Sequence, residues 1–250
     1  MNLNEKQKEI YSRQIMMEDI GESGQQKLAN SSVLVVGCGG LGAPVLNYLT
    51  AMGIGHLGLC DGDTVSLSNL NRQILFTQDD IGKPKASTAK NRLTALNPDL
   101  TTTVYDQYID EQTANTIIPK YDIIVDCLDN FKTRFILNDA SIKAKKPLIH
   151  AGIGEFYGQL MIILPGKSPC LRCLFPKGIK DKEKNTFGVI GTTPGILGTL
   201  QAIEVMKIIL DKPIFSKGIL VVDTLNQTME KVEIKQNPNC ICAGIKADNT

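Results

Sequence analysis

The sequence has no excess of either charge. It contains 27 Lys and Arg residues against 26 Asp and Glu residues, and its net charge is +1. Proteins that bind polyanions or anionic membrane surfaces by electrostatics carry a basic excess. We therefore expect no nucleic-acid partner and no electrostatic attachment to a membrane.

Long hydrophobic runs are also missing. No apolar run approaches the roughly 18 residues that a membrane-spanning helix needs. Residues 1–8 (MNLNEKQK) are polar, and no apolar signal segment follows them. We expect a cytoplasmic protein. Its 250 residues are 42% hydrophobic, which is enough for one large core, so we expect one domain over residues 1–250.

Two further absences bear on chemistry. The sequence has no G-x-x-x-x-G-K-[ST] motif, which excludes the usual phosphate loop of NTPases. It also has only two histidines, His56 and His150. We interpret both as core or strand-end residues without catalytic roles.

Three of the seven cysteines lie in or beside apolar, strand-like runs. They are Cys38, Cys60 and Cys127. A cysteine in such a run is typically a small buried hydrophobic residue in a reducing compartment. We expect no chemistry from these three.

The other four cysteines form two close pairs that are distant in sequence. They are Cys170 and Cys173, spaced C-x-x-C, and Cys240 and Cys242, spaced C-x-C. Two such pairs can complete a closed tetrahedral Zn²⁺ shell, which is structural rather than catalytic. A disulfide pair or accidental spacing remains the alternative, because zinc ribbons usually show C-x-x-C in both pairs.

Strand-sized and helical patterns alternate between residues 32 and 150. Strands are expected at residues 33–36, 56–60, 101–105, 122–127 and 147–150, and helices at 41–52, 84–96, 111–118 and 131–144. This alternation predicts an α/β fold with a Rossmann-like, doubly wound, mainly parallel sheet. Beyond His150, predicted strands at 157–164, 219–222 and 228–234 extend the sheet in antiparallel fashion, and residues 195–210 form an apolar helix.

The first predicted strand runs directly into a glycine-rich turn, Gly37-Cys38-Gly39-Gly40-Leu41-Gly42, which opens a helix. Gly37 permits the tight turn, Gly39 and Gly40 permit close approach of a phosphate, and Gly42 permits close packing of helix and strand. Asp61 ends the next strand, where its carboxylate can bind a ribose. Residues 30–150 are therefore the expected nucleotide-binding half. A purely structural glycine turn and a nicotinamide enzyme remain alternatives.

A polar loop after Asp61 brings cations to the same end of the sheet. Arg72 lies in this loop, and Lys85 lies in the first turn of the following helix. A cation opposes the helix dipole there, so an anion is the expected neighbour. A solvated lysine, or an arginine paired with a nearby aspartate, is the alternative.

Asp129 and Asn130 follow the apolar strand at residues 122–127. A carboxylate at a strand's carboxyl end, facing a triphosphate, is a natural Mg²⁺ ligand. Asp and Asn also cap helices. We expect Asn130 to cap the next helix and Asp129 to hold the metal.

These motifs occur in the order found in the ThiF/MoeB/HesA family, the bacterial relatives of ubiquitin-activating enzymes, and the chain closely resembles that family. The resemblance covers residues 11–244. It rests on residues 11–15 (YSRQI), 37–42 (GCGGLG), 61–63 (DGD), 68–73 (SNLNRQ), 82–85 (GKPK) and 129–130 (DN), and on the four paired cysteines.

The resemblance implies ATP-dependent adenylation of the C-terminal Gly-Gly carboxylate of a small ubiquitin-like sulfur carrier, in thiamine or molybdopterin synthesis. It implies a homodimer in which Arg13 reaches the partner subunit's site, and a carrier-binding, zinc-holding half at residues 151–244. The implied catalytic residues are Arg13, Arg72, Lys85 and Asp129. The implied ATP-binding residues are Gly37, Gly39, Gly40, Gly42, Asp61, Asp63, Ser68, Asn69, Arg72, Gln73, Lys85, Asp129 and Asn130.

The sequence departs from the family pattern in a charged stretch at residues 177–185, which we expect to form a surface loop. Some family members carry a reactive cysteine where this chain has Lys184. We therefore expect no covalent carrier intermediate through this loop, and sulfur delivery by a separate sulfurtransferase. The alternatives are a family member that adenylates another carboxylate, on a peptide or a tRNA, an NAD-dependent oxidoreductase, and a nucleotide-sensing module.

Overall fold

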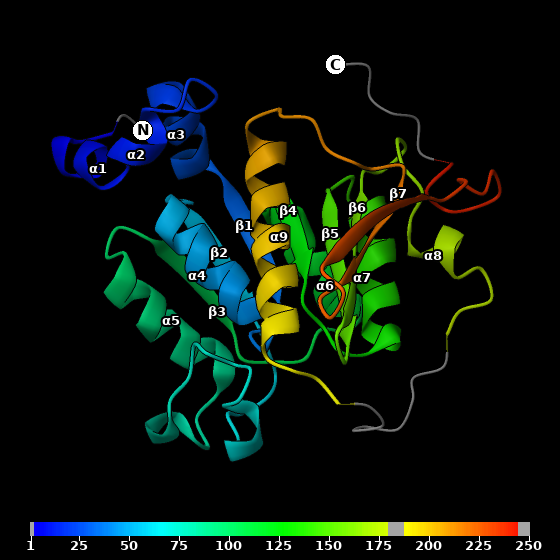
Figure 1. Ribbon diagram of the computed structural model, residues 1–250, viewed down its shortest axis with the longest axis horizontal. Helices are drawn as coiled ribbons and strands as arrows, with labels where there is room; N and C mark the ends of the chain where they lie inside the picture. Colours follow the sequence, from blue (N-terminus) through cyan, green and yellow to red (C-terminus); the bar gives the residue numbers. More distant parts are fainter. Residues whose placement is uncertain (1–2, 180–187, 245–250) are drawn as a thin grey trace.

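The computed structural model describes residues 3–179 and 188–244. It contains one eight-stranded mixed sheet with the order β3-β2-β1-β4-β5-β6-β7-β8 (Figure 1). The strands are β1 (Ser32–Val36), β2 (His56–Cys60), β3 (Thr101–Tyr105), β4 (Ile123–Asp126), β5 (Leu148–Gly154), β6 (Tyr157–Ile163), β7 (Gly218–Asp223) and β8 (Thr228–Glu233). The α/β prediction is confirmed.

The helices between the strands begin and end close to the predicted positions. The longer ones are α3 (Gly21–Asn30), α4 (Gly42–Met52), α5 (Lys85–Leu96), α6 (Glu111–Ile117), α7 (Phe131–Lys143) and α9 (Thr192–Ile209). The shorter ones are α1 (Glu5–Ile10), α2 (Ser12–Ile15) and α8 (Leu171–Leu174), with 3-10 turns η1 (Leu67–Asn69), η2 (Gln78–Asp80) and η3 (Ile118–Lys120). Helices α1, α2, α3 and α8 were not predicted from the sequence.

Strands β1 to β5 are parallel, and the chain direction reverses after β5. Neighbouring strands from β3 to β5 pair in parallel, whereas β6, β7 and β8 each pair in antiparallel fashion with the strand before. Strand β5 continues to Gly154 instead of ending at His150, because residues 151–154 pair with β6. The antiparallel extension is confirmed.

Alternate residues of each strand enter different cores. In β1, Val33 and Val35 pack with α4, α5 and α9, whereas Leu34 and Val36 pack with α6 and α7. Successive side chains of a strand point to opposite faces, so a fully apolar strand requires helices on both. Figure 1 shows α4, α5 and α9 in front of the sheet.

The sheet order reverses between β1 and β4. From β1 the chain builds β2 and β3 toward one edge of the sheet, and it then returns to place β4 on the other side of β1. In open α/β sheets, ligands bind at the carboxyl ends of the strands at such a reversal. The glycine turn follows β1 and Asp129 follows β4, so both lie beside this point.

Within residues 3–179 and 188–244, no helix combines the length and apolar character that crossing a bilayer requires. Lys184 and most of the charged stretch at residues 177–185 lie outside the described residues.

Candidate active site

The glycine turn after β1 is tight enough to exclude side chains at two positions. Gly37 has a φ of 97°, and a Cβ placed there would lie 2.5 Å from the carbonyl oxygen of Cys127. A Cβ on Gly42 would overlap the carbonyl oxygen of Gly37. Glycine is therefore required at both, and helix α4 starts in direct contact with the end of β1.

The start of α4 is suited to an anion. No side chain of the described chain caps this helix. The N–H of Ala43 already bonds the carbonyl of Gly39, and Pro44 has no N–H. The N–H groups of residues 39–42 donate to no backbone acceptor among the described residues, and these are the amides that a ligand can use. The side-chain amide of Gln73 lies beside Gly39, where a Cβ would come within 3.2 Å of Nε2. Gln73 is buried, yet its Oε1 has no hydrogen-bond partner among residues 3–179 and 188–244.

Asp61 holds the turn in shape. Its Oδ2 accepts a hydrogen bond from the backbone N–H of Cys38 at 2.7 Å, and its Oδ1 accepts one from that of Asp63 at 2.8 Å. Burial raises the pKa of this carboxyl, while Lys85 and the two N–H groups oppose the shift. Each oxygen retains a further lone pair for a ribose hydroxyl.

Lys85 is buried rather than solvated, being only 5% exposed at the start of α5. Its Nζ lies 3.1 Å from Oδ2 of Asp63. The solvated alternative for this lysine is therefore wrong. The paired ammonium group faces the loop that joins β2 to α5, which is the loop that carries Arg72.

Tyr108 is a member of this site that the sequence patterns did not reveal. Its hydroxyl donates to Oδ1 of Asp63 at 2.6 Å, and its ring packs on Gly62, where any Cβ would clash with it. Tyr108 is nevertheless 71% exposed. Asp63, and to a lesser degree Asp61 and Asp129, raise the pKa of its hydroxyl. All three carboxylates are therefore close enough to act on this hydroxyl.

Arg72 is held by the loop rather than by an acid. Its Nη1 donates to the carbonyl of Ser68 at 2.9 Å and to Oδ1 of Asn71 at 3.0 Å. No ion pair involves it within the part of the chain that the structure describes, so the alternative of an aspartate partner finds no support. The aliphatic part of its side chain lies beside Gly40, where an added Cβ would be 3.6 Å from Cγ of Arg72.

Ser68 and Asn69 build the support for Arg72. The side chain of Asn69 accepts from the N–H of Ser66, and its carbonyl accepts from the N–H of Arg72 at 3.1 Å. The hydroxyl of Ser68 lies 3.2 Å from that of Ser66. Both predicted ligands thus make local bonds that shape η1.

Asp129 and Asn130 lie at the carboxyl end of β4. Oδ1 of Asn130 accepts from the N–H of Thr133 at 2.9 Å, which confirms it as the N-cap of α7. The side chain of Asp129 is exposed. Its Oδ1 accepts one long hydrogen bond, from Nδ2 of Asn130 at 3.4 Å. The structure therefore supplies the cap and, beside it, an exposed carboxylate at the edge of the site.

Arg13 is the one predicted catalytic residue that does not join this group. It lies in α2, which packs at the far end of α4 through Gln14, whose Nε2 bonds the carbonyl of Met52. Helix α4 has 11 residues and so spans roughly 16 Å. Figure 1 shows α1 to α3 at the opposite end of α4 from the loop joining β2 to α5.

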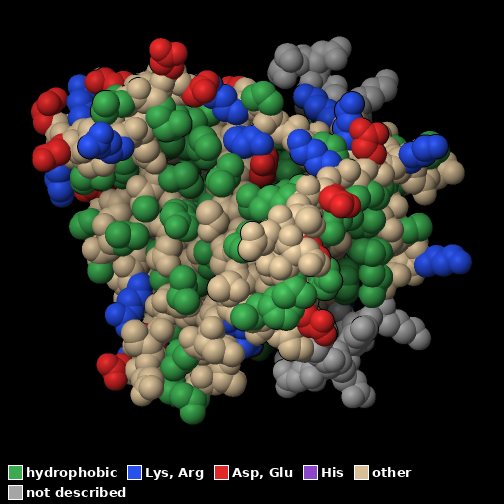
Figure 2. All heavy atoms as spheres, viewed as in Figure 1, with side chains coloured by type: hydrophobic (Ala, Val, Ile, Leu, Met, Phe, Trp, Pro, Cys, Tyr) green, Lys and Arg blue, Asp and Glu red, His purple; other side chains and the backbone are tan. Residues whose placement is uncertain are grey.

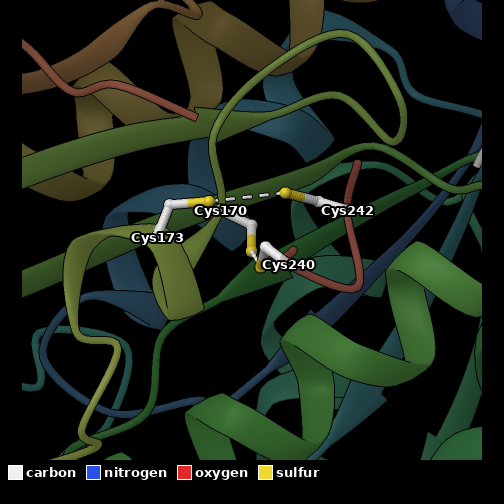
Figure 3. A group of neighbouring side chains, drawn as sticks. All are labelled: Cys170, Cys173, Cys240 and Cys242. Atoms are coloured by element: carbon white, nitrogen blue, oxygen red, sulfur yellow. Dashed lines mark hydrogen bonds between the residues drawn. The ribbon is translucent and has the colours of Figure 1, made fainter. Parts of the chain in front are cut away.

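The four paired cysteines come together (Figure 3), in the hydrophobic cluster that also contains residues of α6 and α7. Their sulfur atoms lie within 4.8 Å of one another, with Cys170 and Cys240 3.5 Å apart and Cys173 and Cys242 also 3.5 Å apart. A tetrahedral Zn²⁺ with Zn–S bonds of about 2.3 Å requires sulfur separations of roughly 3.8 Å. The four thiols fit such an ion.

Burial shifts the acidity of two of these thiols, whereas at Cys173 burial is outweighed by hydrogen bonds, which lower the pKa. Burial raises the pKa of Cys170 strongly and that of Cys242 to about 11. A metal that binds thiolates here must release protons, so its affinity rises with pH. The cluster is anchored to α7, since Arg172 donates to Asp139 at 2.7 Å and Asn138 accepts from the N–H of Leu171 at 3.0 Å.

The remaining cysteines and histidines behave as predicted for core residues. Cys38, Cys60 and Cys127 are buried, and burial raises the pKa of each thiol. His150 is buried in β5, and His56 lies at the start of β2 with its Nε2 2.9 Å from the hydroxyl of Thr103.

A groove leads from the site toward the antiparallel strands. It has a volume of about 570 Å³ and is lined by Asn71, Glu155, Phe156, Gly188, Val189, Ile190 and Gly191. Gly191 touches the Asn71–Arg72 backbone so closely that a Cβ would overlap it. A second hollow of about 520 Å³, beside Lys27 and Asp122, contains none of the predicted site residues.

These features define a nucleotide-binding α/β protein whose glycine turn, acids and cations converge at the sheet reversal. A model of the ThiF family matches residues 11–242. The chain belongs to the ThiF family, and the resemblance inferred from its motifs is confirmed.

Individual proteins support the same assignment. The chain is 40% identical over 248 residues to the SAMP-activating enzyme E1 of Haloferax volcanii, covering 98% of this chain and 92% of that protein. It is 40% identical over 242 residues to the sulfur carrier protein ThiS adenylyltransferase of Escherichia coli, covering 95% and 96%. A crystal structure of E. coli MccB with ATP superposes with a TM-score of 0.82 at 26% identity, covering 94% of this chain and 75% of that one.

Proposed function

We propose that this protein is an ATP-dependent adenylyltransferase that activates the C-terminal Gly-Gly carboxylate of a small ubiquitin-like sulfur carrier. The observation that carries the proposal is the convergence of the glycine turn, Lys85 and Arg72 at one end of the sheet, in a chain of the ThiF family. The similarity to an E. coli protein named ThiS adenylyltransferase supports the carrier as substrate.

The order of the strands supports an orientation for ATP. The glycine turn follows β1, Asp61 ends the neighbouring β2, and Tyr108 lies beyond the next strand, β3. With the phosphates at the turn and the ribose at Asp61, the base extends toward Tyr108. An exposed, fixed aromatic ring suits stacking against a purine.

The reaction requires cations more than a base. The carboxylate of the carrier attacks the α-phosphorus of ATP, an acyl-oxygen–phosphorus bond forms, and pyrophosphate leaves. Lys85 and Arg72 neutralise the charge that accumulates on the phosphoryl oxygens, in positions fixed before the substrate arrives. The carrier's carboxylate is already ionised at neutral pH, so a buried His150 is compatible with catalysis.

The metals belong to the proposal as well. Asp129 is a hard oxygen donor at the edge of the site, and would hold Mg²⁺ bound to the triphosphate, which lowers the charge repulsion met by an anionic nucleophile. The four cysteines would hold Zn²⁺ in a closed shell that stabilises the fold.

A hydrophobic surface beside the groove suits the body of a carrier. Figure 2 shows hydrophobic side chains gathered over the β6–β8 end of the sheet. The exposed members there include Tyr157, Leu225, Met229 and Val232, and Phe156 lines the groove itself. A carrier docked on this surface can send an extended C-terminal tail along the groove toward Arg72.

The location of Arg13 supports a homodimer. It lies roughly the length of α4 from its own glycine turn, so it can meet phosphate only if it enters the partner subunit's site. Ile10, Met16, Met17 and Tyr48 are exposed hydrophobic residues near this end of the molecule, and they suit a surface that is covered by a second copy.

The other expectations complete the proposal. Residues 1–250 form one adenylation unit, with a nucleotide-binding half at about 30–150 and a carrier-binding, zinc-holding half at about 151–244. The protein is cytoplasmic, and a separate sulfurtransferase delivers the sulfur because Lys184 replaces a reactive cysteine.

Pyrophosphate exchange tests the proposal. Labelled pyrophosphate should enter ATP only when a carrier ending in Gly-Gly is present, and a carrier truncated by its last two residues should be inert. Exchange without any carrier, or NAD bound to the purified protein, would contradict it. One second candidate is adenylation of another carboxylate, and it is supported by the similarity to MccB, whose crystal structures include complexes with ATP and with MccA. This candidate predicts exchange with a different acyl substrate and none with the carriers.

A further inference from the structure

A buried polar pair lies directly beneath the segment that presents Asp129. Asp126 is the last residue of β4, and His150 is its partner in the register with β5. Both side chains are fully buried. Nδ1 of His150 lies 2.7 Å from Oδ2 of Asp126.

The bonding fixes the state of the imidazole. A carboxylate only accepts hydrogen bonds, so Nδ1 of His150 carries the hydrogen. Burial lowers the pKa of His150, against the raising influence of Asp126. Nδ1 is therefore the donor in this pair, and Nε2 is buried without a partner within the described chain.

Arg134 of α7 joins the pair from the side of the helix. It is only 6% exposed. Its Nη2 donates to the carbonyl of Leu128 at 2.6 Å and to that of Ala151 at 3.2 Å, while its Nε lies 3.9 Å from Oδ2 of Asp126. The guanidinium group thus lies between β4, β5 and the loop that leads to α7.

The two charged side chains bond the backbone of the same residue, Leu128, one at its N–H and the other at its carbonyl group. Oδ1 of Asp126 accepts from the N–H of Leu128 at 3.0 Å, and Arg134 bonds the carbonyl of that residue. The next residue is Asp129, and Asn130 then caps α7. The backbone on both sides of Asp129 is therefore fixed, although its own side chain is exposed.

A contribution to the stability of the fold does not by itself explain this buried cluster of Asp126, His150 and Arg134. Replacing a buried ion pair by well-packed apolar residues is often neutral or stabilising. Here Nε of Arg134 and Nε2 of His150 are buried without hydrogen bonds among the described residues. The polar groups cost free energy that an apolar core would not, and their bonds converge on one backbone position.

We propose that Arg134 is a positioning residue which, together with Asp126 and His150, holds the Asp129 carboxylate where it can bind the divalent cation of ATP. The inference rests on the proposed function, in which Asp129 holds Mg²⁺. His150 acts only through Asp126, and neither His150 nor Arg134 touches the nucleotide.

The test compares ATP affinity with and without Mg²⁺ in the full-length protein, by titration calorimetry. Arg134→Met keeps the stem and removes the donors. His150→Leu removes the bond to Asp126, whereas His150→Asn keeps a donor near the position of Nδ1. Asn138→Ala is the matched control, because Asn138 is buried in the same helix but bonds Leu171 beside the cysteines.

We expect Mg²⁺ to increase the ATP affinity of the native protein. This Mg²⁺-dependent gain in affinity should fall about tenfold in Arg134→Met and His150→Leu, as for other groups that orient a metal ligand. His150→Asn should keep most of the gain. Asn138→Ala should lower the melting temperature and keep the gain. ATP affinity without Mg²⁺ should stay within about twofold in all four variants, because the glycine turn is unaffected.

An unchanged gain in both Arg134→Met and His150→Leu would overturn the inference and leave the proposed function standing. Equal ATP affinities of the native protein with and without Mg²⁺ would also overturn the inference. A native protein that shows the gain, but catalyses no carrier-dependent exchange, would instead refute the proposed function and retain the positioning role. If Arg134→Met does not fold, the pair of His150 variants decides the matter alone.

Discussion

The ammonium group of Lys85 lies 3.1 Å from Oδ2 of Asp63, and the lysine side chain is almost completely buried. The pair holds a positive charge at the entrance of the glycine turn before any nucleotide arrives. A cation that is fixed in this way stabilises phosphoryl charge without reorganisation during the reaction.

Replacing Lys85 by Met should therefore lower the rate of carrier-dependent pyrophosphate exchange by about 10²- to 10³-fold, the usual effect of removing one preorganised electrostatic group. Lys90→Met is the matched control, because Lys90 is exposed on the same helix. Equal rates for the two variants would remove Lys85 from the mechanism.

Asp129→Ala should abolish adenylation while the protein stays folded, since its side chain is exposed and the cap of α7 is supplied by Asn130. Circular dichroism and thermal melting monitor the fold, and pyrophosphate exchange monitors the chemistry. An unchanged turnover rate would show that the metal is held elsewhere.

Subunits carrying Arg13→Ala and subunits carrying Lys85→Ala should each be inactive, and mixing them should restore activity. One of the two sites in a mixed dimer is then intact. Random exchange makes half of the dimers mixed, so about a quarter of the native activity is expected in a two-fold symmetric dimer. No recovery in demonstrably mixed dimers would mean that Arg13 does not cross the interface.

Cys170→Ala should remove bound zinc and lower the melting temperature by roughly 5–15 °C, because each kcal/mol shifts the melting point of a chain this long by about 2–4 °C. Residual exchange activity at low temperature should fall far less. A metal assay by mass spectrometry accompanies the melt. Loss of activity at an unchanged melting temperature would argue against a structural metal.

Tyr108→Ala should raise the KM for ATP about 3- to 10-fold with little change in kcat, which corresponds to the loss of one aromatic stacking contact. Tyr108→Phe keeps the ring and removes only the bond to Asp63, so its KM should rise less. Equal KM values for Tyr108→Ala and the native protein would place the base elsewhere.

Much of the site could be predicted from local sequence. The glycine turn, Asp61 and the cap at Asn130 each depend on bonds within a few residues of a strand end, and their patterns are visible as spacing. No sequence pattern indicated Tyr108, because its role arises from contacts with Gly62 and Asp63, which follow β2, whereas Tyr108 follows β3. The burial of Lys85 likewise depends on the loop folding over it.

The buried cluster around Asp126 shows the same limit. Asp126 and His150 are 24 residues apart in sequence, and each resembles an ordinary strand-end residue. They become partners only through the pairing of β4 with β5, and Arg134 joins them only when α7 packs against that pair.

By itself, the sequence determined the α/β class, the parallel order of strands and helices, the phosphate turn and the presence of four cysteines in two pairs, since these depend on periodicity, glycine placement and short-range spacing. Only the tertiary structure decided which distant groups meet. It brought the four sulfurs together, paired Lys85 with Asp63, fixed Leu128 between Asp126 and Arg134, and put Arg13 far from its own turn, because strand register and helix packing bring together residues whose separation along the chain carries no local signal.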